Sequence, residues 1–159
     1  MGMRIKAISL TAIFLVLLSV LAQSCRRGSA EDEIRAVIRG ARDAAIEKDV
    51  KGVMRYVSDD YMDDEGNNRD AIKGIVFYQF MRSQKLSVFI SSIDVQVKGT
   101  DAIADVKTVL VAGKTINEIK DIVPDDAAGY LFTIVFKKEA GSWKAKNGRW
   151  RDIGVSGLL

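Results

Sequence analysis

The densest run of side chains that could do chemistry is acidic and lies between residues 59 and 65. Its members are Asp59, Asp60, Asp63, Asp64 and Glu65. A calcium loop needs acids at its first and twelfth positions and a glycine at the sixth, but counting from Gly66 places Tyr61 and Ile72 there. The run therefore does not fit an EF-hand. One of its aspartates could act as a general base if it were buried opposite an oxyanion donor; otherwise the acids are solvated turn residues.

Composition excludes several other kinds of site. The 159 residues contain no histidine and only one cysteine, Cys25, which excludes Ser-His-Asp and Cys-His catalysis, His-ligated zinc and an internal disulfide. The net charge is +3, and two of the positive charges, Arg4 and Lys6, lie in a leader that we expect to be removed. The remaining chain is close to neutral and predicts no nucleic-acid partner. We expect no metal and no cofactor.

The leader ends at the single cysteine. The basic residues Arg4 and Lys6 precede an uncharged run from Ile8 to Ala22. The next residues, Ala22-Gln23-Ser24-Cys25, resemble the lipobox of bacterial lipoproteins, although the usual leucine three places before the cysteine is replaced by Ala22. The resemblance implies a signal peptide over residues 1–24, a lipidated Cys25, a short tether over 25–29 and a place in the bacterial cell envelope, outside the cytoplasm.

Two other interpretations of the leader stay open. Ala22 and Ser24 would also suit an ordinary signal peptidase, which would release an unlipidated secreted protein. Alternatively, the apolar run stays uncut as a membrane anchor. In the lipoprotein interpretation, Arg26 and Arg27 would each add about 1 kcal/mol of attraction to anionic headgroups.

The first half of the mature chain has helical periodicity. Ser29 is the expected cap of a helix with an apolar stripe at Ile34, Val37, Ile38, Ala41 and Ala45. Asp49 is the expected cap of a shorter helix, and Asn68 that of a third helix with a stripe at Ile72, Ile75, Val76 and Phe80.

From Lys85 onward the period changes to two, which predicts four strands. Ser91-Ser92 interrupts the alternation of the first strand and indicates a bulge, and turns are expected at Gly99 and Gly141. The segment 113–129 could prolong a hairpin or contain a helical turn. Residues 30–159 are thus expected to form a single α+β domain.

This order of elements resembles the nuclear transport factor 2-like superfamily of cone-shaped domains. The local likeness lies in Glu47-Lys48-Asp49-Val50, Tyr56-Val57-Ser58-Asp59-Asp60-Tyr61, Asp63-Asp64-Glu65-Gly66 and Asp70-Ala71-Ile72. The resemblance implies about three helices packed on a curved antiparallel sheet of four or more strands. Isomerase-like members carry a general-base aspartate nearest to Asp64, but the tyrosine donor of their first helix has no counterpart between Ser29 and Lys48.

The cone suggests a pocket lined by aromatic side chains. We expect its wall to include Tyr78, Tyr130, Phe132 and Trp150, with the Tyr61 hydroxyl at its mouth. The alternative for these aromatics is an ordinary core. Asp94 and the C-terminal basic residues are expected to be solvated, the latter on an edge strand.

Two functions of different classes follow. The first is a non-enzymatic envelope lipoprotein whose cone binds a small apolar ligand or whose sheet face binds a partner, such as a second copy of the chain. The second is an isomerase, dehydratase or cyclase that uses Asp64 as the base, with Tyr61 beside it.

Replacing Cys25→Ser tests the lipoprotein interpretation. In a bacterial host the wild-type chain should partition with membranes and incorporate labelled fatty acid, because acyl chains are attached through this thiol. The variant should incorporate none. Equal labelling of the two chains would contradict the lipobox interpretation.

Overall fold

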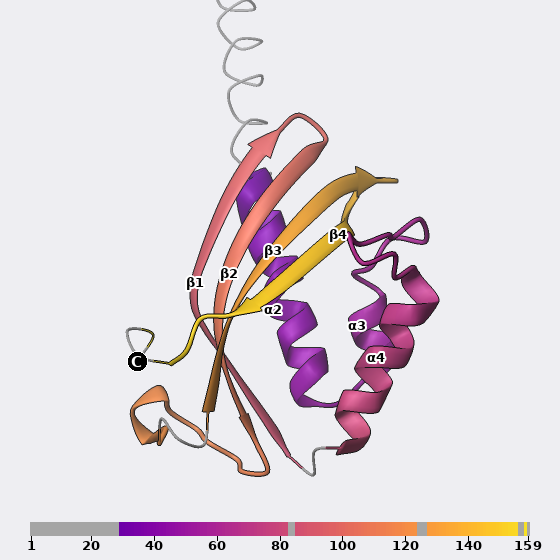
Figure 1. Ribbon diagram of the computed structural model, residues 1–159. Coiled ribbons are helices and arrows are strands. Elements are labelled where there is room, and N and C mark those ends of the chain that lie inside the picture. Colours follow the sequence, from indigo (N-terminus) through magenta and orange to yellow (C-terminus); the bar gives the residue numbers. More distant parts are fainter. Residues whose placement is uncertain (1–28, 83–84, 124–126, 156–157, 159) are drawn as a thin grey trace, which may run out of the picture.

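A computed structural model describes residues 29–82, 85–123, 127–155 and 158 (Figure 1). The elements are α2 (Ala30–Ile46), α3 (Val50–Met54), α4 (Arg69–Arg82), β1 (Leu86–Lys98), β2 (Asp101–Ala112), the 3-10 turn η1 (Ile119–Asp121), β3 (Ala127–Glu139) and β4 (Ser142–Asp152). The strands form one antiparallel sheet in the order β1-β2-β3-β4. This confirms the α+β class, with helices packed on a curved antiparallel sheet.

The leader, Cys25 and most of the tether lie outside the described residues. Within the described ranges, no helix is both long and apolar enough to cross a membrane.

Helix α2 begins with the predicted cap. The Ser29 hydroxyl accepts the Asp32 N–H at 3.2 Å, and the Asp32 carboxylate accepts the Ser29 N–H at 3.2 Å, which makes a complete capping box. Ile34 and Ile38 of the predicted stripe are buried. The stripe then continues at Ala44 rather than at Ala41 or Ala45, because Gly52 of α3 packs there: a Cβ on Gly52 would lie 2.9 Å from the Ala44 Cβ.

Two predictions about the later helices need correction. Asp49 occupies the cap position of α3 but its side chain makes no cap hydrogen bond. Helix α4 does begin at the predicted cap, since Asn68 Oδ1 accepts the Ala71 N–H at 3.0 Å, yet no residue of α4 is buried. Its expected stripe is only half covered because α4 lies beside the other helices rather than flat on the sheet (Figure 1).

The sheet follows the predicted alternation closely. The register of β1 on β2 shifts between Ile90 and Ser92, which confirms the bulge. Gly99 and Gly141 turn the chain with φ values of 63° and 83°, in the left-handed region that glycine adopts without strain. We call the end of the sheet with these two turns the turn end, and the other end, at Ala112 and Ala127, the open end.

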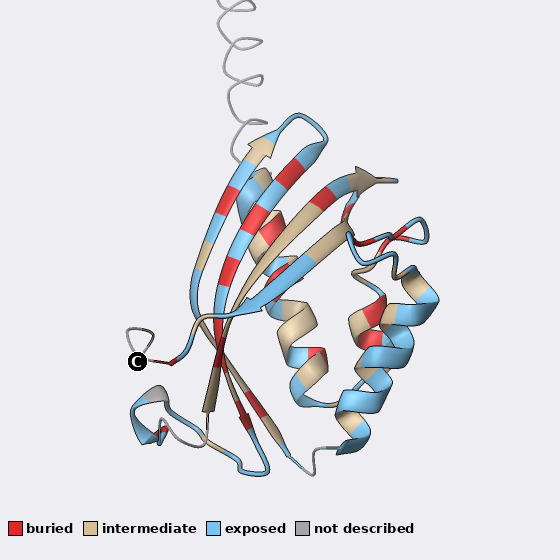
Figure 2. Cartoon of the chain, viewed as in Figure 1, coloured by how far each residue is buried: buried red, intermediate tan, exposed pale blue. Residues whose placement is uncertain are grey.

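The two faces of the sheet are buried by different partners. On the helix face, α2 packs at the turn end against a cluster made of Val95, Ala102, Ala104, Val106, Phe136 and Trp143. On the opposite, outer face, a second cluster at the open end joins Val109 and Val111 to Ile122 and Val155. Figure 2 shows buried residues alternating with exposed ones along β2, as expected for a strand with one covered face. The segment 113–129, for which the sequence left two structures open, contains η1 and contributes Ile122 to this second cluster.

The contact between Gly129 and the C-terminal segment gives a stability prediction. A Cβ on Gly129 would lie 1.8 Å from the Gly154 carbonyl oxygen, a backbone atom, so Gly129→Ala must displace that segment. We expect a loss of about 1–3 kcal/mol in the free energy of unfolding. Gly74→Ala in α4 is the matched control, since a Cβ there meets nothing within 4 Å and should be neutral or stabilising. Equal unfolding midpoints for Gly129→Ala and wild type would contradict this packing.

Candidate functional site

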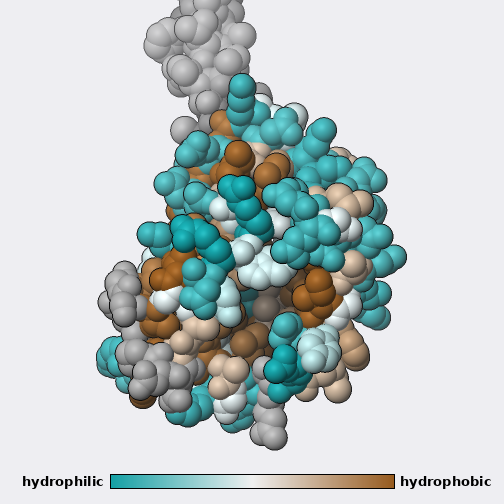
Figure 3. Space-filling model, in the orientation of Figure 1, coloured by the Kyte–Doolittle hydropathy of each residue, from teal (hydrophilic) through white to brown (hydrophobic). Residues whose placement is uncertain are grey.

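The open end of the helix face carries apolar side chains that the described part of the chain does not fully cover. Cross-strand pairing aligns them on one face, and all are half-buried: Val88, Ile90, Leu110, Ala128, Tyr130 and Phe132. Figure 3 shows a hollow below β4, with apolar side chains around it. The half-buried side of α4 is also apolar and carries Ile72, Val76 and Phe80.

Four of the five predicted pocket aromatics gather on this side of the sheet. The Tyr130 and Phe132 rings lie 6.1 Å apart on β3, and Phe132 pairs across the ladder with Trp150 of β4. Tyr61 lies over β4, with its hydroxyl 3.4 Å from the Gly148 carbonyl oxygen. Alternation along β3 predicted the shared face of Tyr130 and Phe132, whereas the Trp150 side chain is 44% exposed.

Tyr78 does not join them. Its side chain is 58% exposed and its ring stacks under the Arg82 guanidinium at 5.5 Å. Tyr78 follows Val76 by two residues, which places it about 200° around the helix from that half-buried side chain. The prediction that Tyr78 lines the pocket is corrected for this reason.

Tyr61 is a buried, neutral phenol rather than a polar group at an open mouth. Only 6% of it is exposed. Burial, followed by the negative charge of Asp63, raises the pKa of its hydroxyl to about 12. The hydroxyl donates a hydrogen bond to the Gly148 carbonyl oxygen and so holds the loop that carries Tyr61 against β4.

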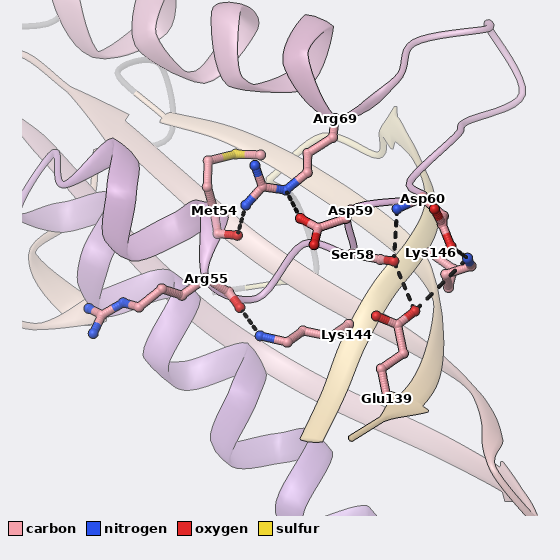
Figure 4. A network of polar contacts seen from close by, with 9 residues as sticks. All are labelled: Met54, Arg55, Ser58, Asp59, Asp60, Arg69, Glu139, Lys144 and Lys146. Carbon is pink, nitrogen blue, oxygen red and sulfur yellow. Dashed lines mark hydrogen bonds and ion pairs between the residues drawn. The ribbon is translucent and has the colours of Figure 1, made fainter. Parts of the chain in front are cut away.

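The loop that carries Tyr61 is fixed by a polar network (Figure 4). The buried Ser58 hydroxyl donates to Glu139 at 2.8 Å and accepts the Asp60 N–H at 3.2 Å. Lys146 on β4 lies 3.5 Å from the Asp60 carboxylate and 3.9 Å from that of Glu139. On the helix side, Arg69 donates to the Met54 carbonyl and pairs with Asp59 at 3.3 Å, and Lys144 donates to the Arg55 carbonyl.

Four of the five acids in the cluster, Asp59, Asp60, Asp63 and Asp64, make polar contacts within the domain. The Asp63 carboxylate accepts the backbone N–H groups of Glu65 and Asn67 and the Asn67 side-chain amide. Burial alone would raise the pKa of Asp63, but these hydrogen bonds outweigh it and hold the pKa below its ordinary value. Asp64 is exposed and accepts from the Asn147 amide at 3.0 Å. Among the described residues, no group of three or more His, Cys, Asp and Glu could hold a metal ion.

Two polar residues of the hollow were missed in the sequence. Thr108 lies on the same face as Ile90 and Tyr130, is buried, and its hydroxyl has no hydrogen-bond partner within the described part of the chain. Asp152 pairs with Tyr130 at the end of β4 and accepts the Gly154 N–H at 2.7 Å. Alternation along β2 and β4 would have placed both on this face had the register been known.

Comparisons with known proteins agree on the architecture. No family model matches the sequence, and no curated protein matches it. An NTF2-like protein of unknown function from Pseudomonas putida is similar over 77% of this chain and 85% of its own, with 17% identity and a TM-score of 0.62. A Nostoc punctiforme protein of unknown function with a cystatin-like fold is similar over 80% of this chain and 93% of its own, with 12% identity and a TM-score of 0.61.

The chain has the nuclear transport factor 2-like fold. Bd1075 of Bdellovibrio bacteriovorus is also similar, with 11% identity and a TM-score of 0.63 over 77% of this chain, which spans 41% of that protein. In this NTF2-like fold the hollow lies where the sheet curves beyond α2.

The raised pKa of Tyr61 predicts a specific loss of stability in alkali. Its folded-state value of about 12 exceeds the ordinary 10.0, so the stabilisation by the neutral phenol is complete below pH 10 and is lost as the pH rises from 10 towards 12. Wild type should therefore lose more unfolding free energy over that range than Tyr61→Phe, as measured by urea unfolding below pH 10 and near pH 12. Identical pH dependence in the two chains would contradict a buried Tyr61 hydroxyl.

Proposed function

We propose that the chain is a membrane-tethered domain of the bacterial envelope that binds a small apolar ligand in the hollow and does not transform it. The observation that carries this proposal is the half-exposed apolar surface at the open end of the helix face. Apolar surface of this kind is costly in water, and covering it with a ligand recovers roughly 25 cal/mol for each Å² removed from solvent.

The polar groups around the hollow favour binding over catalysis. General acid–base chemistry needs a free acid and base that face the same reacting atom. The Tyr61 hydroxyl is bonded to a backbone carbonyl, and Asp152 is bonded to the Gly154 N–H. Asp64, the aspartate that the isomerase alternative requires, is exposed and bonded to Asn147.

The tether and the hollow are compatible with each other. Helix α2 begins at the turn end, where Glu33 bonds to Lys138 at 2.7 Å and to the Trp143 indole at 2.9 Å. A lipid on Cys25 would therefore hold the domain by the end of the sheet opposite the hollow. In this proposal the ligand is taken from the aqueous envelope compartment.

Tyr130→Ala tests the proposed binding surface. With the fluorescent probe 1-N-phenylnaphthylamine, wild type should bind, and the variant should bind about tenfold or more weakly because an aromatic wall of the hollow is removed. Tyr78→Ala is the matched control: it removes the same atoms from the outer side of α4 and should leave probe affinity unchanged.

Asp64→Asn should also leave probe affinity unchanged. Failure of the wild-type chain to bind the probe would contradict the proposed function. If wild type converts a ligand and Asp64→Asn abolishes the conversion, the enzymatic alternative is correct instead.

A further inference from the structure

Thr108 is a buried polar residue in an otherwise apolar part of the sheet. It is 5% exposed, and its hydroxyl has no hydrogen-bond partner within the described part of the chain. An unpartnered buried hydroxyl costs free energy, whereas valine would fill nearly the same space and favour a strand equally well. The helix-face positions on either side of it along β2 carry only alanine, valine or leucine: Ala102, Ala104, Val106 and Leu110.

The neighbours of Thr108 do not supply a partner. Ile90 and Tyr130 flank it across the strands, and Val106 and Leu110 lie two residues away on the same strand face. These four side chains contain one polar group, the Tyr130 hydroxyl, which forms no hydrogen bond with Thr108. A buried water molecule needs two to four polar partners, so this neighbourhood does not suit one. The partner that remains is a bound molecule.

Thr108 lies where such a molecule would meet it. Ile90 and Tyr130 are half-buried and belong to the apolar surface of the hollow, and Thr108 lies between them on β2. A ligand that spans these two side chains therefore passes over Thr108. A rotation of about 120° about χ1 exchanges the hydroxyl of threonine with its methyl group and leaves the backbone in place. The hydroxyl can thus turn towards a ligand without a change in the fold.

We infer that Thr108 donates a hydrogen bond to an uncharged oxygen of the ligand. The hollow then selects an apolar molecule that carries one such oxygen, as a ketone, ether or alcohol, over a pure hydrocarbon. This inference rests on the function proposed above and names the class of ligand. Selectivity follows because a ligand without the oxygen leaves the buried hydroxyl unpartnered, whereas a ligand with it removes that cost.

The charge beside the hollow disfavours an anionic ligand. The row of side chains that contains Ile90, Thr108 and Tyr130 ends at Asp152, which pairs with Tyr130. The Asp152 carboxylate repels a negative head group, and this row contains no cation that could pair with one. The anion of a fatty acid is therefore a poor ligand for this surface.

Three probes of nearly the same shape test the inference. 2-Acetylnaphthalene carries a ketone, 2-isopropenylnaphthalene has a CH2 group in place of the oxygen, and 2-naphthoate carries a carboxylate. Their affinities for the full chain are measured at neutral pH by displacement of 1-N-phenylnaphthylamine. Thr108→Val should bind the ketone about threefold to tenfold more weakly than wild type and the hydrocarbon no more weakly. Wild type should bind 2-naphthoate at least tenfold more weakly than the ketone.

Two variants control for the loss of the hydroxyl. Thr108→Ser keeps a hydroxyl at this position and should keep the wild-type preference for the ketone over the hydrocarbon. Thr133→Val removes the same group from the outer face of β3, where it bonds to Asp105, and should leave the affinities for all three probes unchanged.

Urea unfolding of the free chain gives a second measurement. Thr108→Val removes an unpartnered hydroxyl, so its unfolding midpoint should equal or exceed that of wild type. A lower midpoint would show that the hydroxyl has a partner in the free chain and would overturn the inference. An equal preference for the ketone in wild type and Thr108→Val, or binding of 2-naphthoate as tight as that of the ketone, would overturn it as well. Failure of wild type to bind 1-N-phenylnaphthylamine would instead contradict the proposed function itself, and the inference with it.

Discussion

The apolar helix face of the sheet is longer than the one helix that packs on it. Strands β1 and β3 have 13 residues each, about 43 Å, whereas the 17 residues of α2 span about 25 Å. Burial of Ile34 and Ile38 against the turn-end half fixes α2 there. The open-end half of the same face must then be left for α4, which buries no residue of its own, and for whatever enters between them.

The sequence predicted those parts of the fold that depend on neighbouring residues. The Ser29 capping box, the Asn68 cap, the bulge at Ser91-Ser92 and the Gly99 and Gly141 turns are local arrangements of a few side chains and backbone groups, and the structure confirms them. The sequence could not show that α4 leaves its apolar stripe half exposed. A stripe indicates which side of a helix can be buried, but the partner that covers it is decided by the lengths of distant elements.

At the candidate site too, the sequence predicted what depends on neighbouring residues and not what depends on the pairing of strands. Alternation placed Tyr130 and Phe132 on one face of β3, and this holds. Thr108 and Asp152 joined them only through the register of three strands, which no single stretch of sequence specifies. Tyr78 was misplaced because aromatic character says nothing of the direction in which a side chain leaves its helix.

The central claim is that the uncovered half of the helix face is the binding surface. Methyl-labelled isoleucine spectra, recorded as 1-N-phenylnaphthylamine is added, test it most directly, because the isoleucines sample every region of the domain. Ile90 in the hollow and Ile72 on the inner side of α4 should shift, while Ile34 on the buried side of α2 and Ile103 on the outer face should not. Shifts confined to Ile103, or equal shifts at all four methyls, would contradict the account.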